Sequence, residues 1–178
     1  DSEEEVRKRV KDLSEENKRL VKTAEKRVRE LSKENKELVE RLKREVDRIK
    51  KEIEELKRRG TTEDADRELR ERLEKLKREL EDLNRTLNRR ATELEKEVKR
   101  LSDELRKRAE ELEKKVRREN KVDEKVLREI REIVKKNKRE NEEVLRRIRE
   151  LVKENNDENK RVLDEIEKLL KEIEDESR

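Results

Sequence analysis

Apolar residues recur at helical spacing along the whole chain, and residues 6–56 repeat one such stripe three times. The stripe is Val6, Val10, Leu13, Asn17 and Leu20, then Ala24, Val28, Leu31, Asn35 and Leu38, then Leu42, Val46, Ile49, Ile53 and Leu56. Steps of four, three, four and three residues place these side chains on one face of a helix. Each position returns after 18 residues, which make five turns at about 3.6 residues per turn. The pattern therefore predicts a straight helix that does not supercoil.

The same period continues through the rest of the chain. The second stripe runs from Leu69 to Val116, and the third runs from Val126 to Ile173. The breaks between the stripes predict helices over residues 3–59, 63–118 and 124–176, with loops at 60–62 and 119–123. Three helices of about 55 residues joined by short loops must run up, down and up. We therefore predict an all-α, elongated three-helix bundle with nearly un-supercoiled helices and a single domain over 1–178. Either hand of the three-helix turn buries the same stripes.

The residues at the breaks match the expected helix ends. Ser2, with Glu5 three positions later, predicts a capping box at the first helix. Gly60 is the only glycine and suits a left-handed C-terminal position, and Thr61 or Thr62 can cap the next helix. At the second break, Asn120 can adopt a left-handed conformation and Asp123 can cap the third helix.

Asparagines interrupt the stripes at core positions. Asn17 and Asn35 stand where the third copy has Ile53, and Asn137 and Asn155 stand where the third copy has Ile173. The short loops set the register: facing positions in the first two helices add to about 122, and those in the last two add to about 243. This register brings polar residues of all three helices into the same two layers.

A buried amide without a partner costs about 1–3 kcal/mol, so asparagines that share a layer are expected to bond to one another. We predict two buried hydrogen-bond networks and a possible extension of them. The first network is Asn35, Asn84, Asn88 and Asn155; the second is Asn17, Ser102 and Asn137; the extension is Asn141 and Asn159. Thr86 is expected to face outward.

These layers would also select one register. Sliding a helix by 18 residues realigns every apolar layer, so the repeat alone leaves several registers nearly equal in energy. A slipped helix would bury the amides of Asn17 or Asn35 against Ile or Leu, which disfavours the slipped pairing. The alternative is that asparagines such as Asn88, Asn141 and Asn159 are boundary residues that face water.

Composition and charge limit the function. The chain is 62% charged and 26% hydrophobic, which is typical of disordered proteins, but the regular spacing of its apolar residues predicts helices instead. Its 57 basic and 53 acidic residues are interleaved, leaving a net charge of +4 with no basic face or stacking aromatic residue for nucleic acid. No apolar run approaches the roughly 20 residues of a membrane span. A surface-bound amphipathic helix would leave the asparagines unexplained.

The residue types needed for most catalytic and metal sites are missing. The chain has no His and no Cys, which excludes imidazole bases, thiol nucleophiles and the usual zinc sites. A single Gly excludes a phosphate-binding loop. The sequence predicts no enzyme activity, no cofactor and no metal site.

At this point the chain resembles the parametrically designed helical bundles of de novo protein design. The resemblance covers the whole chain and rests on the 18-residue stripes, the RRGTTED connector at 58–64 and the asparagine layers. It implies a structural scaffold of high thermal stability without a natural substrate or cellular location, and we expect a soluble protein, cytoplasmic on recombinant expression. A natural spectrin-like rod is less consistent with so regular a sequence that lacks Trp.

No partner is required by this reading, and we expect a monomer that binds neither nucleic acid nor membrane. The alternative is a designed binding or self-assembly subunit, a homo- or hetero-oligomer whose stripes partly face another chain. Val21 and Val39 lie beside the first stripe. They would either contribute to a surface that faces another chain or complete the core of the monomer.

Overall fold

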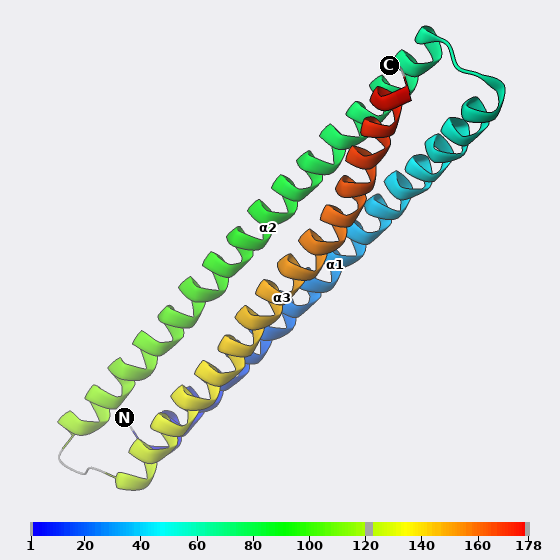
Figure 1. Cartoon of the computed structure of the whole chain (residues 1–178). Coiled ribbons are helices and arrows are strands. Elements are labelled where there is room, and N and C mark those ends of the chain that lie inside the picture. Colours follow the sequence, from blue (N-terminus) through cyan, green and yellow to red (C-terminus); the bar gives the residue numbers. More distant parts are fainter. Residues whose placement is uncertain (1, 120–122, 177–178) are drawn as a thin grey trace. The chain divides into compact units, whose positions relative to one another are not determined.

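The protein forms three long α-helices. A computed structural model describes residues 2–119 and 123–176, and it contains α1 (Glu3–Arg59), α2 (Glu63–Arg118) and α3 (Glu124–Glu176) (Figure 1). These bounds coincide with the helices that the hydrophobic pattern predicts. The chain is therefore an all-α three-helix protein.

The helix ends carry the expected caps. The backbone N–H of Glu5 donates to Ser2 Oγ at 3.3 Å, and that of Ala65 donates to Thr62 Oγ1 at 3.1 Å. Gly60 follows α1 with a φ of 92°, and its N–H donates to the Leu56 carbonyl at 2.8 Å. Each contact satisfies a backbone group that the helix itself leaves without a partner.

The third helix begins at a side-chain cap of the same kind. Asp123 Oδ1 accepts the N–H of Lys125 at 3.0 Å, and the Asp123 carbonyl accepts that of Leu127 at 3.2 Å. The left-handed conformation that the sequence suggests for Asn120 lies outside the described residues.

The chain divides into two compact units. Unit 1 comprises the described residues of Asp1–Arg29 and Ala91–Glu150, and unit 2 comprises those of Glu30–Arg90 and Leu151–Arg178. Each helix contributes one segment to each unit. The single domain over residues 1–178 stays a prediction.

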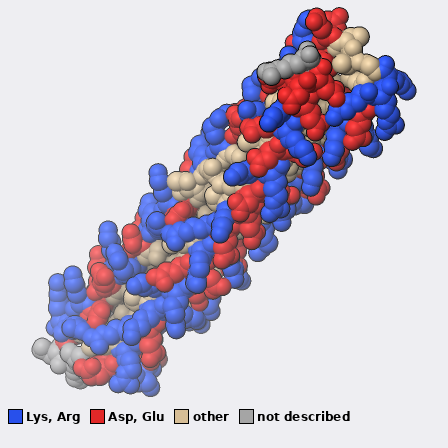
Figure 2. Space-filling view, in the orientation of Figure 1, with Lys and Arg blue, Asp and Glu red and all other residues tan. Residues whose placement is uncertain are grey.

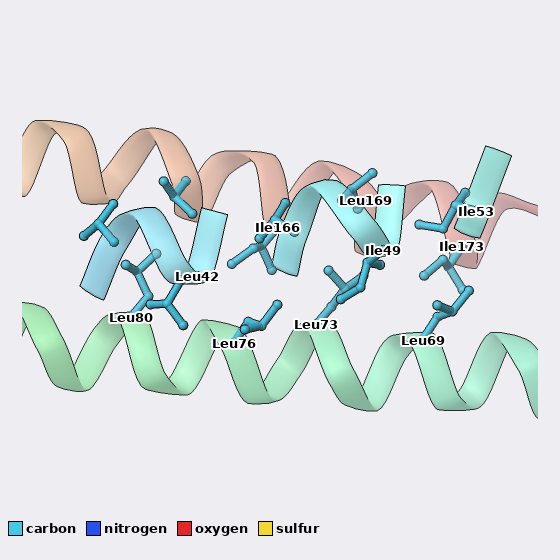
Figure 3. Close-up of a cluster of buried hydrophobic side chains, with 13 residues drawn as sticks. Leu42, Ile49, Ile53, Leu69, Leu73, Leu76, Leu80, Ile166, Leu169 and Ile173 are labelled. Atoms are coloured by element: carbon cyan, nitrogen blue, oxygen red, sulfur yellow. The ribbon is translucent and has the colours of Figure 1, made fainter. Parts of the chain in front are cut away.

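Each unit has its own buried apolar cluster. In unit 1 the cluster includes Val6 and Leu13 of α1, Leu112 of α2 and Ile130 of α3. In unit 2, side chains of all three helices meet in the cluster that Figure 3 shows. Its labelled members are Leu42, Ile49, Ile53, Leu69, Leu73, Leu76, Leu80, Ile166, Leu169 and Ile173. Burying one such side chain stabilises the fold by about 1.5–3 kcal/mol, so these clusters are the main source of stability.

Contacts between α2 and α3 define their register. In unit 1, Arg149 pairs with Glu95 at 3.1 Å and Arg131 pairs with Glu113 at 3.2 Å. In unit 2, Asn156 Nδ2 donates to Asn88 Oδ1 at 3.2 Å. The residue numbers add to the same total in each pair, as they must for antiparallel neighbours. That total lies within two residues of the register predicted from the loop lengths.

Candidate functional site: two buried asparagine clusters

The first cluster lies in unit 2 and contains Asn35 of α1, Asn84 of α2, and Asn155 and Asn159 of α3. Asn35, Asn155 and Asn159 are buried, with exposed fractions of 2%, 2% and 0%, and Asn84 is half-buried. Asn155 and Asn159 are one turn apart and therefore lie on the same side of α3. We call these four residues the unit-2 asparagine cluster.

Hydrogen bonds connect these four side chains across the three helices. Asn35 Nδ2 donates to Asn155 Oδ1 at 2.9 Å and to Asn159 Oδ1 at 3.4 Å. Asn159 Nδ2 donates to Asn35 Oδ1 at 3.4 Å and to Asn84 Oδ1. Asn155 Nδ2 donates to the Leu151 carbonyl at 2.7 Å. Each of the three buried amides thus donates and accepts, which offsets the cost of removing it from water.

Asn88 does not belong to this buried cluster, and the prediction that placed it there is wrong. Its side chain is exposed and accepts a hydrogen bond from Asn156 at the surface. The physical reason is helical geometry: Leu87 occupies the buried position, and the next residue lies about 100° further around the helix. Thr86, on the other side of Leu87, is exposed.

The second cluster lies in unit 1 and contains Asn17 of α1, Ser102 of α2, and Asn137, Glu140 and Asn141 of α3. Asn17 Nδ2 donates to Glu140 Oε2 at 3.2 Å, and Asn141 Nδ2 donates to Ser102 Oγ at 2.9 Å. The exposed fractions of Asn17, Asn137 and Asn141 are 0%, 9% and 3%. We call these five residues the unit-1 polar cluster.

The hydrogen bonds of this cluster differ from those predicted. Among the described residues, no hydrogen bond joins Asn17, Ser102 and Asn137 to one another. Asn17 instead bonds to Glu140, which lies outside the apolar stripe but reaches inward with its long side chain. Ser102 bonds to Asn141, a residue that the sequence offered only as an extension.

Three buried amide oxygens in unit 1 remain without a partner in the described part of the chain. They are Oδ1 of Asn17, Asn137 and Asn141. The residue that corresponds to Ser102 in unit 2 is Asn84, 18 positions earlier, and its longer amide reaches Asn159. A serine has a shorter side chain and one O–H donor. The unit-1 polar cluster is therefore less completely bonded than its unit-2 counterpart.

Ion pairs lie on the surface of both units, where basic and acidic side chains are interspersed (Figure 2). In unit 2, Arg72 of α2 bonds to both Glu45, at 2.8 Å, and Glu52 of α1. The hydrogen bond from Arg72 lowers the pKa of Glu45 below its usual value of 4.5, although partial burial acts in the opposite direction. In unit 1, partial burial acts to raise the pKa of Glu95, but hydrogen bonds from Arg149 and Lys99 outweigh it and the pKa is lowered.

Over residues 2–119 and 123–176, no group of three or more His, Cys, Asp or Glu side chains is arranged to hold a metal ion. Within the same ranges, no helix has a long enough apolar stretch to cross a membrane. The chemistry of the clusters is hydrogen bonding between neutral amides, a hydroxyl and one carboxylate.

Known proteins show limited likeness to this chain. Neither a protein-family model nor a curated protein matches it. Among solved structures, a chain described as "Computationally designed three helix bundle" is similar, with 22% identity over 97% of this chain and 85% of that chain and a TM-score of 0.34.

Proposed function

We propose that the chain is a de novo designed structural scaffold with no natural biochemical activity, and that its polar layers give it register and folding specificity. The observation that carries this proposal is the unit-2 asparagine cluster, in which amides from three helices bond to one another inside an otherwise apolar repeat. The strict 18-residue period and the interleaved surface charges support it. So does the resemblance to parametrically designed bundles.

The short connectors already limit slippage within one chain, so the polar layers contribute to register and specificity chiefly by disfavouring wrong pairings between chains. A three-residue connector such as 60–62 spans about 10 Å, whereas an 18-residue slip displaces a helix by about 27 Å. Helices of one chain therefore cannot slip a full repeat without unfolding their ends. Helices of different chains can, and a slipped pairing would place the amide of Asn35 against apolar residues.

The alternative is a designed subunit that assembles with another chain. Val39, one of the two valines beside the first stripe, is fully buried, with 0% exposure, so it belongs to the unit-2 core. Val21 is half-buried. The buried state of Val39 favours the scaffold reading over a binding surface on this face of α1.

Light scattering coupled to size exclusion, after refolding from denaturant, tests the proposal. The wild-type chain is expected to refold to one species of 21.9 kDa. A variant with an apolar layer, Asn35→Leu/Asn84→Leu/Asn155→Leu/Asn159→Leu, is expected to refold to a mixture of monomer and larger species, because slipped pairings no longer bury the amides of the unit-2 asparagine cluster. A wild-type dimer or larger species would support the assembly subunit instead. If this variant refolds to a single species as the wild type does, the polar layers do not provide folding specificity.

A further inference from the structure

The exposed side chains of α1 in unit 1 are almost all basic over about three turns of the helix. Between residues 18 and 29, seven residues are exposed; none of them is acidic, and Thr23 is the only one without a charge. The other six are Lys18, Arg19, Lys22, Lys26, Arg27 and Arg29. This part of α1 therefore departs from the interspersed charges described above.

Two glutamates lie close to these cations in the sequence, and both are already paired with other helices. Glu16 accepts two hydrogen bonds from Arg108 of α2, the longer at 3.4 Å. Glu25 accepts one from Arg147 of α3. Both glutamates are half-buried. Each carboxylate is thereby matched by a cation of a neighbouring helix, so it does not balance the exposed positive charge of α1.

Five of the six cations form no ion pair within the described part of the chain. Arg27 is the exception, because it bonds to Glu97 of α2 at 2.7 Å. At about 100° per residue, the other five lie within a sector of about 100° on the solvent side of α1. We call them the basic stripe of α1: Lys18, Arg19, Lys22, Lys26 and Arg29.

The cations of the basic stripe repel one another. Lys22 is four residues from both Lys18 and Lys26, which makes these side chains neighbours on the helix surface. Like charges at this spacing destabilise a helix. Arg100 and Arg117 of α2, in contrast, pair at 2.9 Å with glutamates four residues away. A polyanion along the basic stripe would supply the negative charge that α1 lacks there.

The next copy of the repeat shows that the helix itself does not require these cations. The residues 18 positions further on, in unit 2, are also exposed, but three of the five are acidic. They are Lys36, Glu37, Glu40, Arg44 and Asp47. The basic stripe is therefore a property of this stretch of surface, and its charges can be exchanged without changing the buried face of α1.

The chemistry of the basic stripe suits the phosphate backbone of a nucleic-acid duplex. None of the seven exposed residues is apolar and the chain has no aromatic residue, so nothing is present to insert into lipid or to stack on unpaired bases. Because α1 is one continuous helix, the stripe is a line about 16 Å long. A DNA duplex carries one negative charge per about 1.7 Å of its axis. It therefore offers more phosphates over this length than the stripe has cations.

We propose that the basic stripe of α1 binds the phosphate backbone of double-stranded DNA without regard to base sequence. Contacts to phosphates hold a protein on a duplex but do not read its bases. Such binding is driven by counterion release, so it weakens steeply as the salt concentration rises. Counts of charge along the sequence, from which we expect no nucleic-acid binding, hide the stripe because they include the paired glutamates. This binding is independent of the scaffold role, since it uses only exposed side chains.

Fluorescence anisotropy of a labelled duplex of about 20 base pairs, titrated with protein at several salt concentrations, tests the proposal. For five phosphate contacts, the logarithm of the binding constant should fall against the logarithm of the salt concentration with a slope of about −4 to −5. Arg19→Glu/Lys22→Glu/Arg29→Asp gives this stretch the charges of the next copy. We expect this variant to bind at least about tenfold more weakly, with a slope shallower by about 3 and unchanged helicity.

A variant of α2 controls for net charge. Lys96→Glu/Lys107→Glu/Lys114→Glu makes the same change of charge at exposed positions of unit 1, and it should keep the salt slope of the wild type. Equal losses of affinity and slope in the two variants would reduce the effect to net charge and overturn the proposal. A wild-type slope shallower than about −2 would do the same. Binding to phosphatidylserine vesicles but not to the duplex would assign the stripe to membranes and also overturn it.

Discussion

An asparagine at a core position replaces an apolar side chain with one that needs hydrogen bonds. Its effect on stability depends on whether both its amide N–H group and its amide oxygen have partners. Asn155 and Asn137 occupy the same position of the α3 repeat, 18 residues apart. Asn155 accepts from Asn35 and donates to the Leu151 carbonyl. The oxygen of Asn137 is buried without a partner. The two residues are therefore chemically identical but energetically different.

Replacing each of these asparagines by leucine should reveal the difference. Asn155→Leu adds apolar burial but removes the acceptor of Asn35, whereas Asn137→Leu removes an acceptor that bonds to nothing. We expect Asn137→Leu to leave the protein more stable than Asn155→Leu by about 1–3 kcal/mol. Guanidinium denaturation followed by circular dichroism measures both variants against the wild type. Equal stability of the two variants would show that the unit-2 hydrogen bonds contribute little.

The sequence predicts the buried asparagines of the stripes, but it does not predict all of the residues that bond to them. The positions of Asn17, Asn35 and Asn155 follow from the repeat, which is a local property of the helix. Glu140 and Asn156 were missed because both lie outside the stripe. No signal in the spacing marks Glu140, since its contact depends on how far a long side chain bends inward.

At the scale of the helix, the ends were predictable because the apolar stripes stop where Gly60 and residues able to cap a helix stand. Gly60 has a φ of 92°, which a residue with a side chain adopts only with strain, and it is the only glycine. Thr62 accepts the Ala65 N–H at the start of α2. Thr61 adds a contact that the pattern did not predict: its hydroxyl bonds to the buried Asp66 at 2.7 Å.

Gly60→Ala tests the helix end. Nothing lies within 4 Å of a Cβ placed on Gly60, so the substitution introduces conformational strain without a clash. We expect a loss of about 1 kcal/mol in the free energy of unfolding, and a smaller loss for Gly60→Asn because asparagine tolerates the left-handed region better. Chemical denaturation gives both values, with Arg59→Ala as the control within α1. A loss as large for the control as for Gly60→Ala would contradict this account.

At the scale of the whole molecule, charge determines how stability responds to pH. The 57 basic residues remain charged in acid, whereas the 53 acidic residues become neutral, so the net charge rises steeply as the pH falls. Self-repulsion then disfavours the folded state. Individual surface ion pairs contribute at most about 1 kcal/mol, and their contribution disappears over the same range.

The ion pair between Glu45 and Arg72 shows how one carboxylate contributes to this dependence on pH. Its side chain is 29% exposed and bonds to Arg72 at 2.8 Å, and that hydrogen bond lowers its pKa from the usual 4.5. A carboxyl group whose pKa is lower in the folded state stabilises the protein above its unfolded pKa, and this stabilisation is lost as the pH falls through the folded pKa. The wild type should therefore exceed Glu45→Gln in stability at pH 7 and lose that advantage as the pH falls below the usual carboxyl value of 4.5 and through the lowered folded-state pKa.

Urea denaturation of both proteins at several pH values measures this difference. A range of roughly pH 2 to 7 is suitable because carboxylates titrate within it. Glu55→Gln is a suitable control because Glu55 is an exposed glutamate of the same helix. The Glu45→Gln difference should shrink in acid, while the control should follow the wild type throughout. A Glu45→Gln difference that stays constant with pH would mean that the glutamate stabilises unit 2 through packing of its aliphatic carbons, because packing does not depend on the charge of the carboxylate.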